Sequence, residues 1–313
     1  MKKSITLGLT LFSLFIINCS VSNTSSTNPN NTNAPTGTGK AVKVYIAGES
    51  IEKRNSFIEA PFTATGALNE RGGGELRNDN EEYGWMIPFA DRLKLRAPGF
   101  QVEFVGSETW LSSDDNPYSG KYPASGAGKT SAISGTSIDS WLEQRSSELS
   151  AKPHCYDIAI AARGGNDFGL DNDAEIKGQL KKLINLLADG SNCRKDPVIY
   201  VTAHMPDDQR SEGQNDQEYV ELQKQRFVKR FSEAVNEMKA EKPALQLRFI
   251  DMYTPFIENR KTTAFPNEQW SANGIPDFYK IGRIDDRIHP RRLASIYAGE
   301  IVADGFNLAD LNR

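Results

Sequence analysis

Five short apolar runs rich in β-branched residues alternate along this chain with longer stretches of helical periodicity. The runs are residues 42–47, 102–105, 158–162, 198–202 and 245–250. Strands that alternate with helices are joined by right-handed crossovers and form a parallel sheet that is covered on both faces. We therefore expect an α/β fold, a flavodoxin-like three-layer α/β/α sandwich built on a five-stranded parallel sheet.

The segments between these runs fall into two kinds. Apolar residues at intervals of three and four predict helices, and they cover residues 83–95, 137–149, 176–187, 219–238 and 292–303. Three further connections, 51–82, 106–135 and 252–284, lack such a pattern and are long. Long connections in a compact domain are usually functional, so we expect surface loops that border an active site.

The first 18 residues predict an export signal. Two lysines precede an apolar stretch at 5–17, which is shorter than the roughly 20 residues of a membrane span but suits a signal sequence. The stretch ends at Cys19 and resembles a bacterial lipoprotein signal, in which the cysteine receives a lipid. Asn18 departs from the small residue that is usual there, and the alternative is an ordinary signal peptide with a chance cysteine.

Residues 19–40 are rich in Ser, Asn, Thr, Pro and Gly and cannot build a core, so they predict a flexible tether. The remaining residues, 41–313, suit one domain. These features together predict an exported protein. A lipid at its N-terminus would anchor it to a membrane of the bacterial cell envelope.

The charge and the histidine content argue against a nucleic-acid partner and against a metal site. The net charge of −4 argues against nucleic acid, because phosphate binding depends on clusters of Lys and Arg. Of the three histidines, His154 and His204 are far apart in sequence and lack clustered ligands. We therefore expect no metal site, and nothing in the chain calls for a cofactor.

Cys155 and Cys193 each stand a few residues before an apolar run. If these runs are neighbouring parallel strands, both thiols lie at the same end of the sheet. An exported protein can oxidise such a pair to a disulfide. The alternative is two buried free thiols.

Polar residues follow three of the predicted strands, and one of them, His204, comes shortly after the fourth. The sequence Gly-Glu-Ser at 48–50 follows the first strand, and Gly-Gly-Asn-Asp at 164–167 follows the third. Sites in open parallel sheets lie beyond the carboxyl ends of the strands, which places Ser50, Asn166 and His204 on one edge. Each polar residue alone is more simply a turn or helix cap.

An acid and a histidine, Asp286 and His289, stand three residues apart near the end of the chain. This spacing allows a carboxylate to fold back onto the imidazole from the same loop. Asp286 alone has a simpler interpretation as a cap of the last helix. Together with a serine and an amide donor, however, the pair completes the groups that acyl transfer requires.

These motifs resemble those of the SGNH or GDSL hydrolases, flavodoxin-like serine esterases defined by four sequence blocks. Residues 48–50 match the first block, 164–167 the third and 286–290 the fourth, and the second is best matched by the single glycine at 134–137. The resemblance extends over about residues 42–304. Glu49 departs from the family's usual aspartate.

The resemblance implies a role for each matched residue. Ser50 would be the nucleophile, His289 the general base, and Asp286 the residue that orients His289. The oxyanion hole would consist of the backbone N–H groups of Ser50 and Gly135 and the side-chain amide of Asn166.

The function implied is hydrolysis of O-acyl esters, with acetyl the expected acyl group and a carbohydrate or similar polar molecule the expected substrate. The carbohydrate preference depends on aromatic residues in the long segments, which could stack on sugars or simply pin the loops: Trp110, Tyr118, Tyr122 and Trp270. Alternatives on the same fold are a lipase or lysophospholipase, an acyltransferase, and a non-catalytic surface binding protein.

Overall fold

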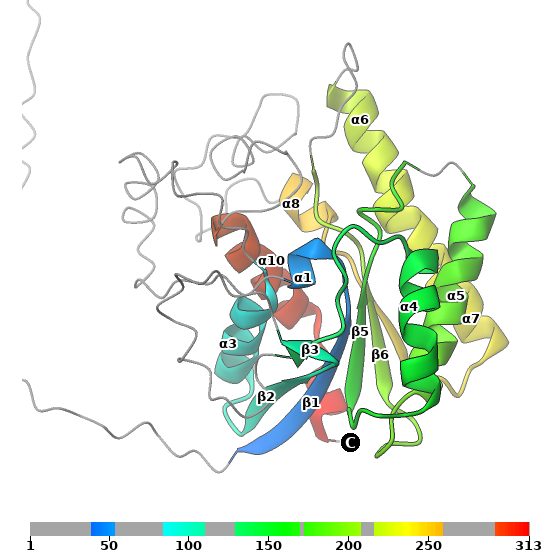
Figure 1. The fold of residues 1–313 in the computed structure, drawn as a ribbon. Helices are drawn as coiled ribbons and strands as arrows, with labels where there is room; N and C mark the ends of the chain where they lie inside the picture. The colour runs from blue at the N-terminus through cyan, green and yellow to red at the C-terminus, as the bar shows by residue number, and fades with distance from the viewer. Residues whose placement is uncertain are drawn as a thin grey trace, which may run out of the picture. The chain divides into compact units, whose positions relative to one another are not determined.

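Five strands form one parallel sheet in the order β2-β1-β5-β6-β7 (Figure 1). The strands are β1 (Lys40–Ala47), β2 (Phe100–Val105), β5 (Ile158–Ala162), β6 (Val198–Thr202) and β7 (Leu247–Ile250). All four pairings between neighbours are parallel. The predicted five-stranded parallel sheet is therefore confirmed.

The computed structural model describes residues 39–53, 84–109, 129–169, 172–207, 216–258 and 292–312. All of them belong to one compact unit, Thr38–Arg313. The predicted signal at 1–18, with Cys19 and nearly all of the tether, lies outside the described residues. Among the helices described, none is long and apolar enough to cross a membrane.

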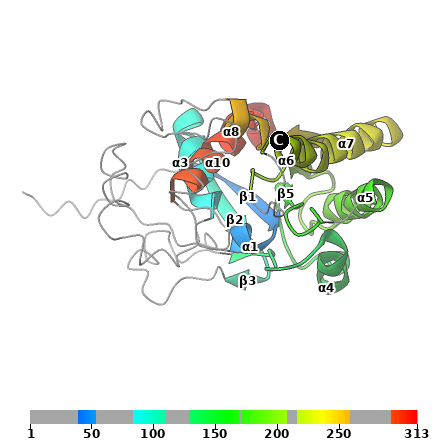
Figure 2. The same ribbon diagram turned by 90° about the horizontal axis from the view of Figure 1, so that it is seen from above.

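Helices cover both faces of the sheet, as Figure 2 shows from above. One face carries α3 (Met86–Arg96) and α10 (Arg292–Gly305), and the other carries α4 (Ile138–Ser150), α5 (Asp173–Asp189) and α7 (Arg230–Glu241). The predicted three-layer α/β/α arrangement is therefore confirmed.

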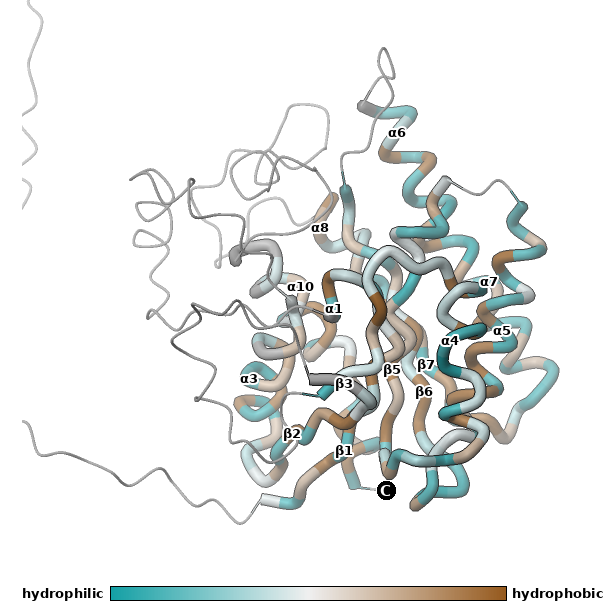
Figure 3. Tube along the Cα trace, in the orientation of Figure 1, coloured by the Kyte–Doolittle hydropathy of each residue, from teal (hydrophilic) through white to brown (hydrophobic). Residues whose placement is uncertain are grey.

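The central strand β5 shows why the sequence gives two cores. Its residues alternate between them, with Ile158 and Ile160 in one core and Ala159 and Ala161 in the other. All five of its residues are buried, so the strand is apolar throughout rather than alternately apolar and polar (Figure 3).

Several short elements complete the described chain. They are α1 (Ser50–Lys53), β3 (Glu108–Thr109), β4 (Lys129–Thr130), α6 (Asp216–Gln223), the π-helix η2 (Lys224–Lys229), α8 (Thr254–Glu258) and the 3-10 helix η3 (Leu308–Asn312). The predicted helix over 219–238 is thus three consecutive helical segments. The expected loop at 106–135 contains a short antiparallel pair, β3 and β4.

A disulfide joins Cys155 to Cys193, with an S–S distance of 2.07 Å. Cys155 lies three residues before β5, and Cys193 lies five residues before β6. Because these strands are parallel neighbours, the disulfide crosslinks the amino end of the sheet.

Candidate active site

Two of the predicted site segments lie where the strand order of the sheet reverses. From β1 the chain moves outward to β2 and then returns to the other side of β1 to form β5. In open α/β sheets ligands bind beyond the carboxyl ends of the strands at this point. Ser50 follows β1 and Asn166 follows β5, so both lie at this position.

Ser50 is the first residue of the short helix α1 and is partly exposed. Glu52, two residues later, accepts a hydrogen bond from the backbone N–H of Glu49 (2.8 Å), which is the back-bond of a helix capping box. The indole N–H of Trp85 donates to the other oxygen of Glu52 (2.7 Å). Burial raises the pKa of Glu52, and the nearby Glu49 carboxylate adds to the rise. These contacts fix the turn that carries Ser50.

Asn166 is tied to the segment that carries Ser50 by the side chain of Glu49. The backbone N–H and the side-chain Nδ2 of Asn166 both donate to Oε2 of Glu49, at 3.0 and 2.7 Å. The backbone N–H of Gly164 donates to the other carboxylate oxygen (2.5 Å). A Cβ atom on Gly165 would lie 2.6 Å from His204 Nε2 and 2.9 Å from Glu49 Oε2. Only glycine therefore fits at position 165.

Gly135, the predicted glycine of the second block, lies in the turn before α4 with a φ of +69°, a conformation that favours glycine. The chain leading to this turn runs along the end of β1. The N–H of Ser131 donates to the carbonyl of Ile46 (3.2 Å), and that of Ile133 donates to the carbonyl of Gly48 (3.1 Å). The second block is thus placed beside the first.

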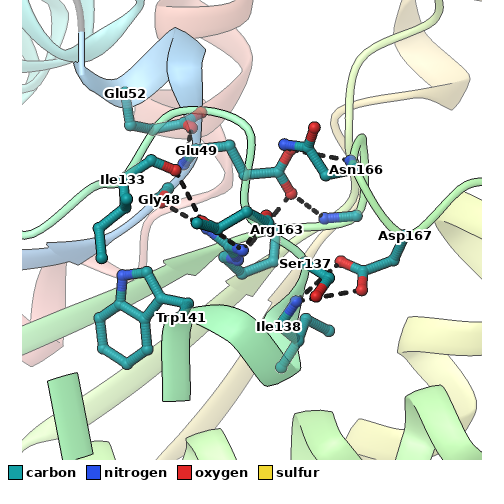
Figure 4. A network of polar contacts seen from close by, with 12 residues as sticks. Gly48, Glu49, Glu52, Ile133, Ser137, Ile138, Trp141, Arg163, Asn166 and Asp167 are labelled. Carbon is teal, nitrogen blue, oxygen red and sulfur yellow. Dashed lines mark hydrogen bonds and ion pairs between the residues drawn. The ribbon is translucent and has the colours of Figure 1, made fainter. Parts of the chain in front are cut away.

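The side chain of Arg163 lies between the three blocks (Figure 4). Its guanidinium is buried and donates through Nη1 to the carbonyl of Gly48 (2.5 Å). Through Nη2 it donates to the carbonyl of Thr136 and to the hydroxyl of the same residue (3.2 Å). Its Nε lies 3.9 Å from the Glu49 carboxylate. The cation thereby contacts both the Ser50 turn and the Gly135 turn.

Asp167 anchors the third block to the start of α4. Both oxygens of this buried carboxyl group accept from the backbone N–H of Ile138, at 3.1 and 3.2 Å (Figure 4). Burial, with the nearby charge of Glu49, raises the pKa of Asp167 to about 6. The Ser137 hydroxyl caps the same helix by accepting from the N–H of Ser140 (3.3 Å).

Two of the three histidines lie in the described part of the chain. His204 is buried beside Gly165, with its Nδ1 2.6 Å from the Met205 carbonyl oxygen and its ring 5.0 Å from that of Phe227. His154 lies at the other end of the sheet and contacts Glu148 through Nε2 (2.7 Å). Within the described residues, no group of three or more His, Cys, Asp or Glu side chains could hold a metal ion.

Asp286 and His289 lie outside the described residues, as do the loop aromatics Trp110, Tyr118, Tyr122 and Trp270. The helix that follows them is described, and α10 begins at Arg292. Tyr297, in its second turn, donates to the carbonyl of Pro255 (3.1 Å), just beyond the carboxyl end of β7. Asp304, near its end, pairs with Arg92 in the later half of α3 (3.1 Å). Helix α10 therefore starts at the carboxyl edge of the sheet, where Ser50 lies.

No known family model and no curated protein matches this chain. Several solved structures are similar. A family 3 carbohydrate esterase from Clostridium thermocellum is 14% identical with a TM-score of 0.47, and the match covers 85% of this chain and 95% of that chain. An acetyl esterase mutant with bound acetate is 14% identical, with a TM-score of 0.45 and coverage of 84% and 95%. A catalytic mutant of an acetylxylan esterase from Geobacillus stearothermophilus is 16% identical, with a TM-score of 0.43 and coverage of 88% and 97%.

Sequence reasoning missed Glu52, Arg163 and Asp167 as residues that shape the site. The signal for Arg163 was present in the chain, because a charged residue directly follows five apolar residues that form a buried strand. A buried cation needs partners, so its position alone indicated a polar network at the strand end. Glu52 carried a weaker signal, as an acidic residue in the first turn of a short helix.

Proposed function

We propose that this chain is a serine esterase that hydrolyses O-acyl esters with Ser50 as the nucleophile. The observation that carries the proposal is the contact of Glu49, the residue before Ser50, with the side-chain amide of Asn166 (2.7 Å). This contact ties the residue that precedes Ser50 to an amide donor at the point where the strand order reverses. Acyl transfer needs a nucleophile and an oxyanion donor in this proximity.

In the proposed reaction, Ser50 Oγ attacks the carbonyl carbon of the ester while its proton passes to the imidazole of His289. The carbonyl oxygen becomes an oxyanion, which the N–H groups of Ser50 and Gly135 and the Asn166 amide would stabilise. The intermediate collapses to an acyl-enzyme, and the leaving alcohol takes the proton from His289. Water then attacks the acyl-enzyme by the same route and releases the carboxylic acid.

The path of α10 supports the role given to His289. The helix starts at the carboxyl edge of the sheet, and His289 precedes its first residue by three positions. Three residues span at most about 10 Å, so the start of α10 is compatible with a general base at this edge. Asp286 would orient the imidazole and stabilise its charged form.

We propose that the substrate carries a small acyl group, with acetyl as the candidate, on a carbohydrate or similar polar alcohol. Sequence supports this through the aromatic residues of the long segments, which are suited to stacking on sugar faces. A screen of the full chain on acetylated glycans and on long-chain acyl esters would test the choice. Faster release of long-chain acids would show a lipase-like enzyme, and transfer to an added alcohol without hydrolysis would show an acyltransferase.

The decisive test of the esterase proposal is turnover of p-nitrophenyl acetate by the full chain and by Ser50→Ala. Loss of the nucleophile should reduce kcat by at least about 10⁴-fold, because the remaining groups cannot form the acyl-enzyme. Ser147→Ala is a matched control, since Ser147 is exposed on α4. A fluorophosphonate should label the wild type and the control but not Ser50→Ala. Equal turnover by all three proteins would refute the proposal and favour a binding protein.

We also propose that the protein is exported and anchored to the bacterial cell envelope by a lipid on Cys19. The disulfide between Cys155 and Cys193 supports export, because such bonds persist in oxidising compartments. Metabolic labelling with an alkyne fatty acid should mark the wild-type protein and leave Cys19→Ala unlabelled in the soluble fraction. Equal labelling of both, or labelling of neither, would contradict the anchor.

A further inference from the structure

A buried ion pair lies beneath the candidate site. Glu49 is 2% exposed and Arg163 is 1% exposed, and Arg163 Nε lies 3.9 Å from Glu49 Oε1. The two residues occupy equivalent positions on neighbouring strands, since Ala47 of β1 pairs with Ala161 of β5 and each charge follows two residues later. Buried charges destabilise a fold unless their other hydrogen bonds are satisfied. The remaining contacts of this pair offset part of this cost, although Arg163 Nε has no hydrogen-bond partner among the described residues.

These contacts cross between the blocks. Arg163 directly precedes the third block and donates to the carbonyl oxygens of Gly48, in the first block, and Thr136, in the second. Glu49 belongs to the first block and accepts from the Gly164 and Asn166 backbones and the Asn166 amide, all in the third. The Arg163 side chain therefore holds the first and second blocks, and the Glu49 side chain holds the third.

The atoms held in this way adjoin the proposed oxyanion donors. The peptide between Gly48 and Glu49 is fixed at its carbonyl by Arg163 and at its N–H by Glu52, directly before Ser50. The Thr136 carbonyl follows Gly135 by one residue. The Nδ2 atom of Asn166 carries two hydrogens, and if Glu49 accepts one, the other remains for a substrate oxygen.

We propose that Glu49 and Arg163 form a positioning pair that holds the Ser50, Gly135 and Asn166 donors in one geometry. The inference depends on the proposed esterase function and adds two residues that act through the donors rather than on the substrate. It also explains the glutamate at position 49. The side chain must cross from the end of β1 to the loop after β5, and an aspartate would be about 1.5 Å shorter. Hydrogen bonds of 2.5–3.0 Å would then exceed bonding distance.

The kinetic test uses Glu49→Gln, which keeps the length of the side chain but removes the charge and one acceptor oxygen. Because a shift of about 1 Å in a catalytic group can cost about 100-fold, kcat for p-nitrophenyl acetate should fall by about that factor while KM changes little. Glu49→Asp should not restore kcat, although it keeps the charge. The matched control is Glu233→Gln, which breaks a surface ion pair with Lys177 (2.8 Å) and should retain wild-type kcat.

A second readout does not depend on activity. In an NMR spectrum of the ¹⁵N-labelled full chain, the two side-chain amide protons of Asn166 should have widely separated chemical shifts. The reason is that only one of the two protons bonds to a carboxylate. The resonances are identified by their loss in Asn166→Asp. In Glu49→Gln the separation should collapse, whereas in Glu233→Gln it should stay unchanged.

The two readouts separate the inference from the function. Collapse of the amide separation in Glu49→Gln, with a wild type that hydrolyses no ester, would keep the positioning pair and end the esterase proposal. Wild-type kcat and an unchanged amide signal in Glu49→Gln would overturn the pair and leave the esterase standing. If the variants do not fold, hydrogen exchange in the wild type decides. The Gly164 and Asn166 backbone amides should be as protected as those of β5, and exchange at the rate of an exposed loop would overturn the inference.

Discussion

Asp167 is a buried acid whose environment favours its protonated form. Burial, with the charge of Glu49, raises its pKa to about 6 from an ordinary value of 3.8. In the unfolded chain the Asp167 carboxyl group has the ordinary pKa. Its higher pKa in the folded chain therefore stabilises the fold fully at pH values below the ordinary pKa. The contribution is lost as the pH rises through the folded pKa. The difference between the two values corresponds to about 3 kcal/mol.

This gives a prediction for Asp167→Asn, which keeps an oxygen for the Ile138 N–H but carries no charge. From about pH 4 to about pH 7 the free energy of unfolding of the variant should rise, relative to the wild type, by up to about 3 kcal/mol. Chemical denaturation at a series of pH values measures this difference. A difference that stays constant across the range would contradict the assignment of the raised pKa.

Glu148→Gln is the control with the opposite sign. Burial works against ionisation of Glu148, but hydrogen bonds with His154 and Ser107 and the charge of Arg145 lower its pKa to about 2. Its stabilising contribution is therefore present above the ordinary value of 4.5 and is lost only as the pH falls toward about 2. From about pH 2 to about pH 5, the free energy of unfolding of Glu148→Gln should therefore fall relative to the wild type, which is opposite in sign to the change in Asp167→Asn.

Single residues also show what the sequence could predict of the site. Ser50 and Asn166 were identified because each follows an apolar strand, which is a local pattern. The bond from Asn166 to Glu49 joins residues 117 positions apart and depends on the register of β1 against β5. No local pattern encodes that register. Arg163 is itself marked by its position after an apolar strand, but its partners are not, because they belong to segments far away in the chain.

The strands were predicted best where burial is complete. The bounds of β5 and β6 match the predicted runs, since both strands are apolar throughout and lie at the centre of the sheet. The outer strand β2 and its neighbour β1 each begin two residues before the predicted run. Their first residues are partly or fully exposed and pair through the backbone, so hydrophobicity does not mark them.

The long helical pattern at 219–238 shows a limit of periodicity. The segment is helical throughout, but Lys224–Lys229 is a π-helix. Its buried Phe227 packs against the rings of His204 and Phe168, both at 5.0 Å, next to the loop that carries Asn166. A π-helical turn places one extra residue in a turn, and such turns are frequent at functional sites. Apolar spacing cannot separate it from an ordinary helix.

The candidate site and the disulfide lie at opposite ends of the sheet. The carboxyl ends of β1 and β5 carry Ser50, Asn166 and the buried pair beneath them. The amino ends of β5 and β6 carry the disulfide between Cys155 and Cys193. Strand β5 alone separates the two by five residues, or about 16 Å at 3.3 Å per residue. A crosslink placed there can stabilise the fold without touching the candidate site.

The double variant Cys155→Ala with Cys193→Ala tests this separation. The disulfide closes a loop of 38 residues, and the chain-entropy estimate for such a loop is about 3–4 kcal/mol. The free energy of unfolding should fall by about that amount, whereas kcat in the folded protein should stay within about two-fold of the wild type, because distant sites are usually independent. Reductant should lower the free energy of unfolding of the wild type but not of the double variant, so the double variant controls for other effects of the reductant. A large loss of kcat in the folded double variant would show that the amino end of the sheet is coupled to the site. An unchanged free energy of unfolding would show that the disulfide does not stabilise the fold.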